Sequence, residues 1–261
     1  MSAPHRSAIS WCDYSSGDAN FITGCTPVSE GCANCYARRI YERFGRDFSQ
    51  VHIHWDKLDR LWRWRPPKTH WPYGRWKARQ KRPMVFVCDT GDLFHEDLLD
   101  SDLRQILGVL IERQDITWQL LTKRAERMAR LMSEYEPWML GHIWAGITAE
   151  NQSRVNERLP QLLQVPTAVR WVSVEPMLSP VNLAFPLEGS WQLENVQWVV
   201  CGAESGPKRR PFDRWWALRL YEQCQGANIA FFGKQESGVR PGVPLSLPGV
   251  GDVKEWPEET E

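Results

Sequence analysis

Residues 169–175, Val-Arg-Trp-Val-Ser-Val-Glu, carry the pattern that decides the fold, which is a mostly apolar run that ends at a glutamate. A run of this length is typical of a strand buried on both faces, as strands are in parallel sheets. Similar runs recur along the chain and predict further strands. They lie at 84–88, 118–121, 142–147, 196–201 and 229–232.

Segments with helical periodicity lie between these runs, at 101–113, 124–134, 149–163 and 214–225. Strands that alternate with such helices predict βα units and a parallel sheet. A first strand near 9–11 or 21–23 brings the predicted total to about seven. We therefore expect an α/β fold, a complete or partial (β/α) barrel of the TIM type, formed by residues 1–261 as a single domain.

The charge of the chain is balanced, with 32 basic and 32 acidic residues, so attraction to nucleic acid has to be local. The first residues lack the apolar run of a signal peptide, and no stretch approaches the ~18 apolar residues of a membrane span. These features predict a cytoplasmic protein with no membrane partner. Thiols stay reduced there, so close-set cysteines favour a metal site or catalysis over disulfides.

Polar residues follow nearly every apolar run at the point where the predicted strand ends. Because the carboxyl ends of parallel strands form one rim, where active sites of such folds lie, we expect these side chains to converge. Asn151 and Asp213 also suit helix caps, but capping does not explain the lysines and glutamates. The set comprises Asp89, Thr90, Gly91, Asp92, Thr122, Lys123, Thr148, Glu150, Asn151, Glu175, Gly202, Glu204, Ser205, Lys234 and Gln235.

Three cysteines are close together in the segment GCTPVSEGCANCY, residues 24–36. Cys32 and Cys35 have the spacing that lets two thiolates reach one metal centre, and Cys25 lies on the same turn-rich loop. Three protein thiolates on a cubane cluster leave one iron open to another ligand. A structural zinc site is the alternative, with Cys12, His52 or His54 as a fourth ligand. The cysteines at 88, 201 and 224 suit small core residues.

Residues 55–82 form a basic, aromatic insertion with ten lysines and arginines, five tryptophans and two aspartates. Cationic side chains neutralise phosphates and indoles stack on unpaired bases, so the stretch predicts a nucleic-acid contact. Solvated ion pairs and cation–π contacts are the alternative. The candidate phosphate contacts are Arg63, Arg65, Lys77 and Arg79. The acidic residues 252–261 are expected to form a flexible tail.

The segment GCTPVSEGCANCYARRI, residues 24–40, resembles the signature of a phage- and prophage-associated family with a three-cysteine motif. The function of that family was formerly unknown, and it is related to the radical S-adenosylmethionine (SAM) superfamily. The usual superfamily spacing puts three residues between the first two cysteines, whereas six lie between Cys25 and Cys32. The likeness continues through VCDTGDLFHEDL, WQLLTKRAERM, WAGITAENQ, VRWVSVEPML, VVCGAESGPKRRPF and FFGKQESG, and so spans nearly the whole chain.

This resemblance implies a partial TIM barrel with a [4Fe-4S] cluster held by Cys25, Cys32 and Cys35. The open iron would chelate SAM, and reduction by an external one-electron donor would yield a 5′-deoxyadenosyl radical. In this picture Tyr36 packs on adenine, Asp89 or Asp92 binds the methionine ammonium, and Thr90 and Gly91 lie between them in an altered glycine-rich motif. The ribose or carboxylate of SAM is assigned to Ser173 and Glu175, or to Thr148 and Asn151.

The remaining polar residues of the rim are assigned to the reaction and the substrate. Glu175, Glu204 and Lys234 are the catalytic candidates, and Lys123 serves the cofactor or the substrate. Ser205, Arg209, Arg210 and Gln235 are substrate candidates.

The leading hypothesis is therefore a radical SAM enzyme that rearranges or isomerises a modified nucleobase, for example hypermodified thymine in phage DNA. Two alternatives come from other classes of protein. One is a zinc- or cluster-stabilised module that binds nucleic acid without catalysis. The other is a metal-dependent nuclease that uses Asp89, Asp92 and Glu175.

Overall fold

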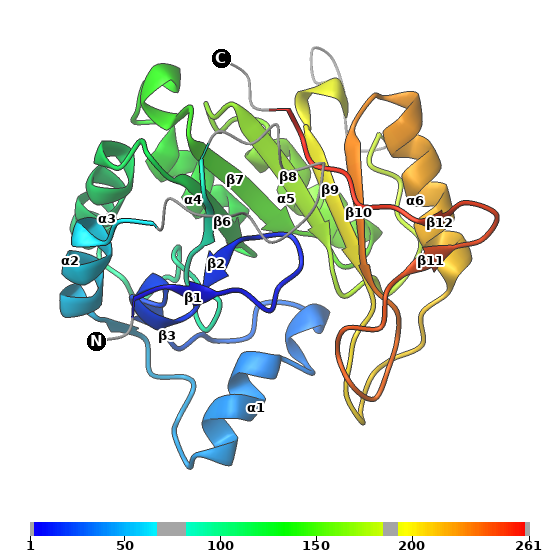
Figure 1. Ribbon diagram of the computed structural model, residues 1–261, viewed down its shortest axis with the longest axis horizontal. Coiled ribbons are helices and arrows are strands. Elements are labelled where there is room, and N and C mark those ends of the chain that lie inside the picture. The colour runs from blue at the N-terminus through cyan, green and yellow to red at the C-terminus, as the bar shows by residue number, and fades with distance from the viewer. Residues whose placement is uncertain (1–2, 67–81, 185–192, 259–261) are drawn as a thin grey trace.

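An eight-stranded sheet forms the centre of the computed structural model, which describes residues 3–66, 82–184 and 193–258 (Figure 1). The strand order is β1-β2-β5-β6-β7-β8-β9-β10. Only β1 is antiparallel to its neighbour, and the other neighbours pair in parallel. The strands are β1 (His5–Arg6), β2 (Tyr14–Ser15), β5 (Met84–Phe86), β6 (Thr117–Thr122), β7 (Ile143–Thr148), β8 (Val169–Val174), β9 (Trp198–Gly202) and β10 (Ala230–Gln235).

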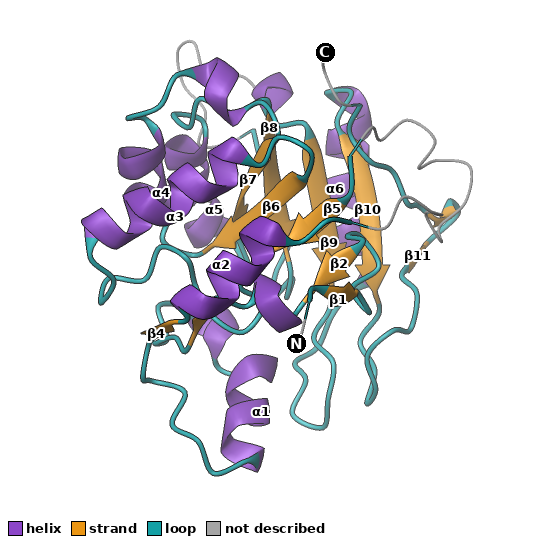
Figure 2. Ribbon diagram, turned by 60° about the vertical axis from the view of Figure 1, so that its left-hand side comes forward, coloured by secondary structure: helices purple, strands orange, loops and turns teal. Residues whose placement is uncertain are grey.

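The sheet curls into a half-barrel, which confirms the partial form of the predicted (β/α) barrel (Figure 1). Helices cover its convex face and a short helix projects from one end (Figure 2). The helices are α1 (Tyr36–Arg43), α2 (Trp55–Arg63), α3 (Asp100–Glu112), α4 (Ala125–Met132), α5 (Gln152–Leu162) and α6 (Arg214–Gly226), with 3₁₀ turns η1 (Gly17–Ala19), η2 (Glu30–Cys32), η4 (Pro137–Leu140) and η5 (Leu193–Asn195). No helix in the described part of the chain is long and apolar enough to cross a membrane.

The six apolar runs and four helical segments predicted from the sequence are all present, with shifts of one to three residues at most ends. The prediction for the first strand is wrong. Residues 9–11 form a bend and a turn, and β3 (Ile22–Thr23) pairs with β4 (His52–Ile53) outside the main sheet. The first strand to join the parallel part is β2, which is too short to show a period of its own.

Side chains of the strands alternate between two apolar layers, which is why the runs are nearly continuous. In β5, Val85 packs in the layer under the helices, whereas Met84 and Phe86 face the concave side. The concave side is filled by aromatic rings, with centroid distances of 5.1 Å between Trp11 and Trp171 and 5.3 Å between Trp171 and Trp198. The aromatic filling leaves the rim of strand ends as the place for a site.

The residues after β11 (Ser246–Leu247) and β12 (Gly251–Asp252) do not form the flexible tail that was expected. Lys254 pairs with Phe232 of β10, and the Trp256 ring lies 4.7 Å from the Phe232 ring. The prediction is wrong as far as residue 258 because two backbone bonds and one buried aromatic contact outweigh the acidic composition. Residues 259–261 lie outside the described residues.

Candidate functional site

The loop that carries the three cysteines lies against the carboxyl ends of the parallel strands. The described cysteines fall into two groups, because Cys25, Cys32 and Cys35 are partly exposed and the other four are buried. Gly24 starts the loop with a positive φ of 88°, and its amide donates to the carbonyl of Thr90 beside the end of β5. A side chain at Gly24 would overlap the backbone at Gln50, so the start of the loop requires glycine.

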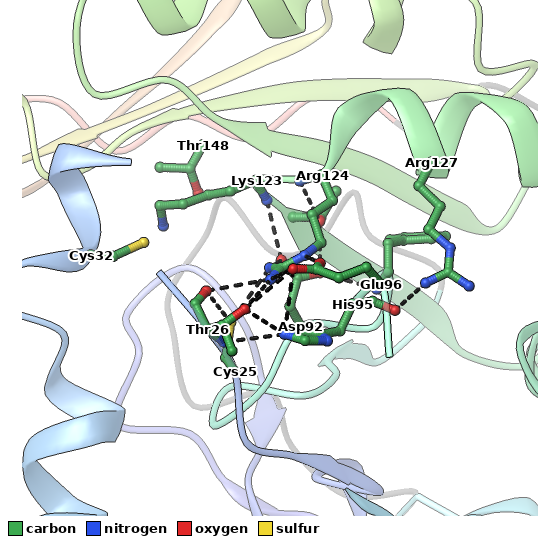
Figure 3. A network of polar contacts seen from close by, with 12 residues as sticks. Cys25, Thr26, Cys32, Asp92, His95, Glu96, Lys123, Arg124, Arg127 and Thr148 are labelled. Carbon is green, nitrogen blue, oxygen red and sulfur yellow. Dashed lines mark hydrogen bonds and ion pairs between the residues drawn. The ribbon is translucent and has the colours of Figure 1, made fainter. Parts of the chain in front are cut away.

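A buried ion pair holds the Cys25 end of the loop (Figure 3). Arg124 Nη1 lies 3.0 Å from Asp92 Oδ2 and 3.5 Å from Cys25 Sγ, and its Nη2 donates to the carbonyl of Thr26 at 3.3 Å. Asp92 also accepts from the Thr122 hydroxyl at 2.6 Å. Asp89 or Asp92 was predicted to bind the methionine ammonium, and in the structure both carboxylate oxygens of Asp92 accept from these donors at the end of β6.

A second buried pair supports the middle of the loop. Glu150 and Arg158 have side chains 0% and 1% exposed, with 2.9 Å between Oε2 and Nη1. The Ser29 hydroxyl donates to Glu150 Oε1, and a Cβ at Gly31 would overlap the same carboxylate. Glu150 appeared in the sequence only as one of many polar strand ends. Arg158 gave no signal there, because it lies two turns into α5.

A third pair holds the far end of the loop. Glu204 accepts from the backbone amide of Arg210 at 2.8 Å, from its Nε at 3.0 Å, and from Asn34 Nδ2 at 3.0 Å. Arg210 Nη1 in turn donates to the carbonyl of Glu30 at 2.9 Å. Glu204 was predicted as catalytic and Arg210 as a substrate contact. In the structure the two residues contact each other and the cysteine loop.

The surroundings give the thiols different acidities. Burial, with a smaller effect from Asp92, raises the pKa of Cys25 to about 11, against the opposing charge of Arg124. Burial also acts to raise the pKa of Cys32, but the charge of Lys123 and nearby hydrogen bonds outweigh it and the pKa falls below its ordinary value. Figure 3 shows the Lys123 side chain extended toward Cys32. Since the thiolate is the form that binds metal, Cys32 is the better prepared of the two.

Other predicted residues lie on the same rim with partners of their own. Lys234 Nζ lies 2.8 Å from Glu175 Oε1, which joins two of the predicted catalytic residues in an ion pair. Asp89 accepts from the Ser16 hydroxyl at 2.6 Å, and its carbonyl accepts from the Tyr36 hydroxyl. The ion pair joins β10 to the end of β8, and the Tyr36 bond joins the start of α1 to the end of β5.

Several of the predicted site residues cap a helix, are buried at strand ends or contact the backbone. Asn151 caps α5 by accepting from the Arg154 amide at 3.1 Å, as the capping alternative predicted. Gln235 is buried and donates to the carbonyl of Ala203 at 2.9 Å. Thr148 and Ser173 are buried at the ends of their strands. Gly91 packs closely on the β3 backbone, because a Cβ there would lie 2.8 Å from the carbonyl of Ile22. Ser205 forms a β-bridge with Gly238, and Arg209 is exposed.

In the described part of the basic insertion, the predicted phosphate contacts Arg63 and Arg65 lie at the end of α2 that is away from the rim. Arg63 pairs with Asp59 of its own helix at 2.8 Å, and Arg65 donates to backbone carbonyls at the end of α2. Arg113 donates to the carbonyls of Leu61 and Trp62 just before β6 begins, which places this end of α2 at the amino ends of the strands. Lys77 and Arg79 lie outside the described residues.

The donor set fits an iron–sulfur cluster in its chemistry. Three partly exposed thiols share one loop that three acid–arginine pairs hold against the strand ends. As they stand, no three His, Cys, Asp or Glu side chains in residues 3–66, 82–184 and 193–258 are grouped closely enough to hold a metal ion. Cys12 does not suit the fourth ligand of the zinc alternative, because its thiol is buried and donates to the Ser7 hydroxyl.

The chain is similar in fold to a solved structure, "Spore photoproduct lyase complexed with dinucleoside spore photoproduct". The TM-score is 0.52 at 14% sequence identity, and the likeness covers 85% of this chain and 64% of the other. No curated protein matches. A family model matches residues 6–243, which include the cysteine loop and every strand from β2 to β10. The chain therefore belongs to the family described as "Protein of unknown function (DUF5131)".

Proposed function

We propose that this protein is a radical SAM enzyme whose [4Fe-4S] cluster is held by Cys25, Cys32 and Cys35. The observation that supports this most is the position of the three-thiol loop at the carboxyl ends of parallel strands, where active sites of α/β barrels lie. Three thiolates leave the fourth iron open for SAM. When bound, the cluster and SAM supply a carbon-centred radical that removes a hydrogen atom from a substrate.

The residues around the loop have distinct tasks in this proposal. The three acid–arginine pairs position the loop, and Lys123 lowers the pKa of Cys32 so that it binds iron as the thiolate. We assign Tyr36, beside the third cysteine, to packing on adenine, and Thr148 and Ser173 to the ribose of SAM. The ion pair of Glu175 and Lys234 is the candidate for moving a proton, because one group can give what the other accepts.

The substrate class that we propose is a modified nucleobase. The similarity in fold to a lyase in complex with a dinucleoside supports a nucleic-acid substrate. The finer proposal is a rearrangement or isomerisation of a hypermodified pyrimidine, in a phage-associated, cytoplasmic setting, with electrons from a separate one-electron donor. A nuclease is disfavoured, since Asp92 and Glu175 are paired with Arg124 and Lys234 and do not share a metal position.

Low-temperature EPR on anaerobically reconstituted, reduced protein tests the proposal. We expect a [4Fe-4S]⁺ signal that changes when SAM is added and disappears in Cys32→Ala. The matched control is Cys224→Ala, which removes a buried thiol far from the loop and should keep the signal. A cluster signal indifferent to SAM, or zinc in place of iron, contradicts the proposal.

A further inference from the structure

Helix α1 exposes an apolar stripe beside the cluster loop. Tyr36, Ile40 and Phe44 follow each other at intervals of four residues and are 49%, 45% and 68% exposed. Positions four apart lie on one side of a helix, so the three side chains form one continuous surface. Ala37 is the only buried residue of this helix, and Figures 1 and 2 show α1 standing away from the sheet. An exposed apolar surface of this kind calls for a partner.

Cations flank the stripe. Arg39 and Arg43 lie on the same side of α1, and the sequence from 36 to 46 has four arginines against Glu42. Arg39 Nη2 donates to the carbonyl of Ser205, which joins this side of the helix to the loop after β9. In that loop Lys208 and Arg209 are exposed. In a chain with no net charge, this concentration of positive charge favours a polyanion.

We infer that the face of α1 formed by Ile40, Phe44, Arg39 and Arg43, next to Tyr36, binds the unpaired nucleic-acid strand that flanks the reacting nucleotide. This rests on the proposed function, and it identifies the surface that receives the substrate. Aromatic side chains stack on any base, and neighbouring arginines neutralise the phosphates, which together are the usual features of single-strand binding. A base to be modified also has to leave its stack, so unpaired nucleotides are expected at the rim.

The location of α1 strengthens the inference. The helix begins directly after Cys35, and the hydroxyl of Tyr36 is bonded to the carbonyl of Asp89 at the end of β5. A strand that lies along α1 therefore leads straight to the candidate site. In the described part of the basic insertion, residues 61–66 with Arg63 and Arg65 lie at the other end of the sheet and do not offer this path.

Fluorescence anisotropy of a labelled single-stranded oligonucleotide, with reconstituted holoenzyme and SAM under anaerobic conditions, tests the inference. We expect Phe44→Ala to weaken binding about tenfold, which is the loss of one stacked base. Arg43→Gln should reduce the slope of log Kd against log salt by about 0.7, the value for one phosphate contact on a single strand. Trp138→Ala is the matched control, since Trp138 is 75% exposed on η4, away from the site, and its loss should change neither quantity.

Three results would overturn the inference. The first is equal affinity in wild type, Phe44→Ala and Arg43→Gln, all shown by thermal melts to be folded. The second is tighter binding of a duplex than of the single strand, with a duplex affinity that Phe44→Ala leaves unchanged. The third is unchanged DNA affinity with slower reduction by an acidic electron-transfer protein, which would assign α1 to the reductant. Cleavage of SAM by the dithionite-reduced wild type without DNA tests the proposed function separately, so the two failures are distinguishable.

Discussion

Arg124 is the side chain that joins the candidate cluster to the fold most directly. Its guanidinium is almost buried and reaches the Cys25 sulfur, the Asp92 carboxylate and the Thr26 carbonyl. The reduction potential of an iron–sulfur cluster depends on hydrogen bonds to its sulfur atoms and on nearby charge. A cationic donor in contact with one ligand stabilises the reduced cluster, which carries the additional negative charge.

We therefore expect Arg124→Gln to lower the midpoint reduction potential of the cluster, measured by EPR-monitored redox titration. Arg124→Lys keeps the charge without the forked geometry, and its potential should lie between those of Arg124→Gln and wild type. Because Arg124→Gln leaves the Asp92 carboxylate buried without its ion pair, the double variant with Asp92→Asn is also needed. Its local net charge equals that of wild type, so its potential should be closer to wild type than that of the single variant.

Arg130→Gln is the control for this series, since Arg130 is exposed and pairs with Asp100 away from the cysteines. Its potential should equal that of wild type. If Arg124→Gln binds a full complement of iron and its potential does not move, Arg124 has a purely structural role.

At the scale of elements, the close fit between neighbouring strands depends on Gly146 in β7. A Cβ at this position would overlap the Trp171 indole of β8, in an aromatic layer that has no room to yield. We expect Gly146→Ala to lower the free energy of unfolding by about 1–3 kcal/mol, measured by urea denaturation. In a double-mutant cycle, Trp171→Phe should recover part of that loss, because the smaller ring frees space.

Gly108→Ala is the matched control for the effect of glycine replacement itself. Gly108 lies within α3, and an added Cβ there meets no atom within 4 Å. Alanine should stabilise that helix by up to about 1 kcal/mol. Similar losses at positions 108 and 146 would refute the packing explanation.

The strands and helices could be predicted because each apolar run is buried on two faces and each helix on one, so composition and period both signal them. The short strand β2 could not be predicted from the sequence. Tyr14 joins the sheet by pairing with Val85 of β5, and a strand of two residues is too short to show an alternation of apolar and polar side chains. The cysteine loop was identified by spacing. The contacts of Glu204 with Arg210 and with the cysteine loop were not, because a glutamate in an ion pair and a glutamate that moves protons look the same in a sequence. The contacts that distinguish them join residues far apart in the chain, as with Asn34 and Glu204.

The molecule as a whole has an open sheet, so its edge strands need protection from other chains. At one edge β1 is only two residues long. At the other, residues 253–255 cover β10, where the amide of Gly233 donates to Val253 and that of Glu255 donates to Phe231, each at 2.9 Å. The last residues of the described chain thus cover the β10 edge of the half-barrel, where composition alone suggested a tail.

Truncation after Asp252 should therefore both destabilise the protein and make it associate. We expect Trp256→Ala, which keeps the backbone pairing, to cost roughly 2–3 kcal/mol, less than the ~3–5 kcal/mol of a fully buried tryptophan. The truncated chain should lose more and should also form concentration-dependent oligomers in analytical ultracentrifugation, because the β10 edge is then exposed. Trp215→Ala, at a position 60% exposed on α6, should change neither stability nor association. A truncated chain that stays monomeric at wild-type stability would show that residues 253–258 lie on the sheet without supporting it.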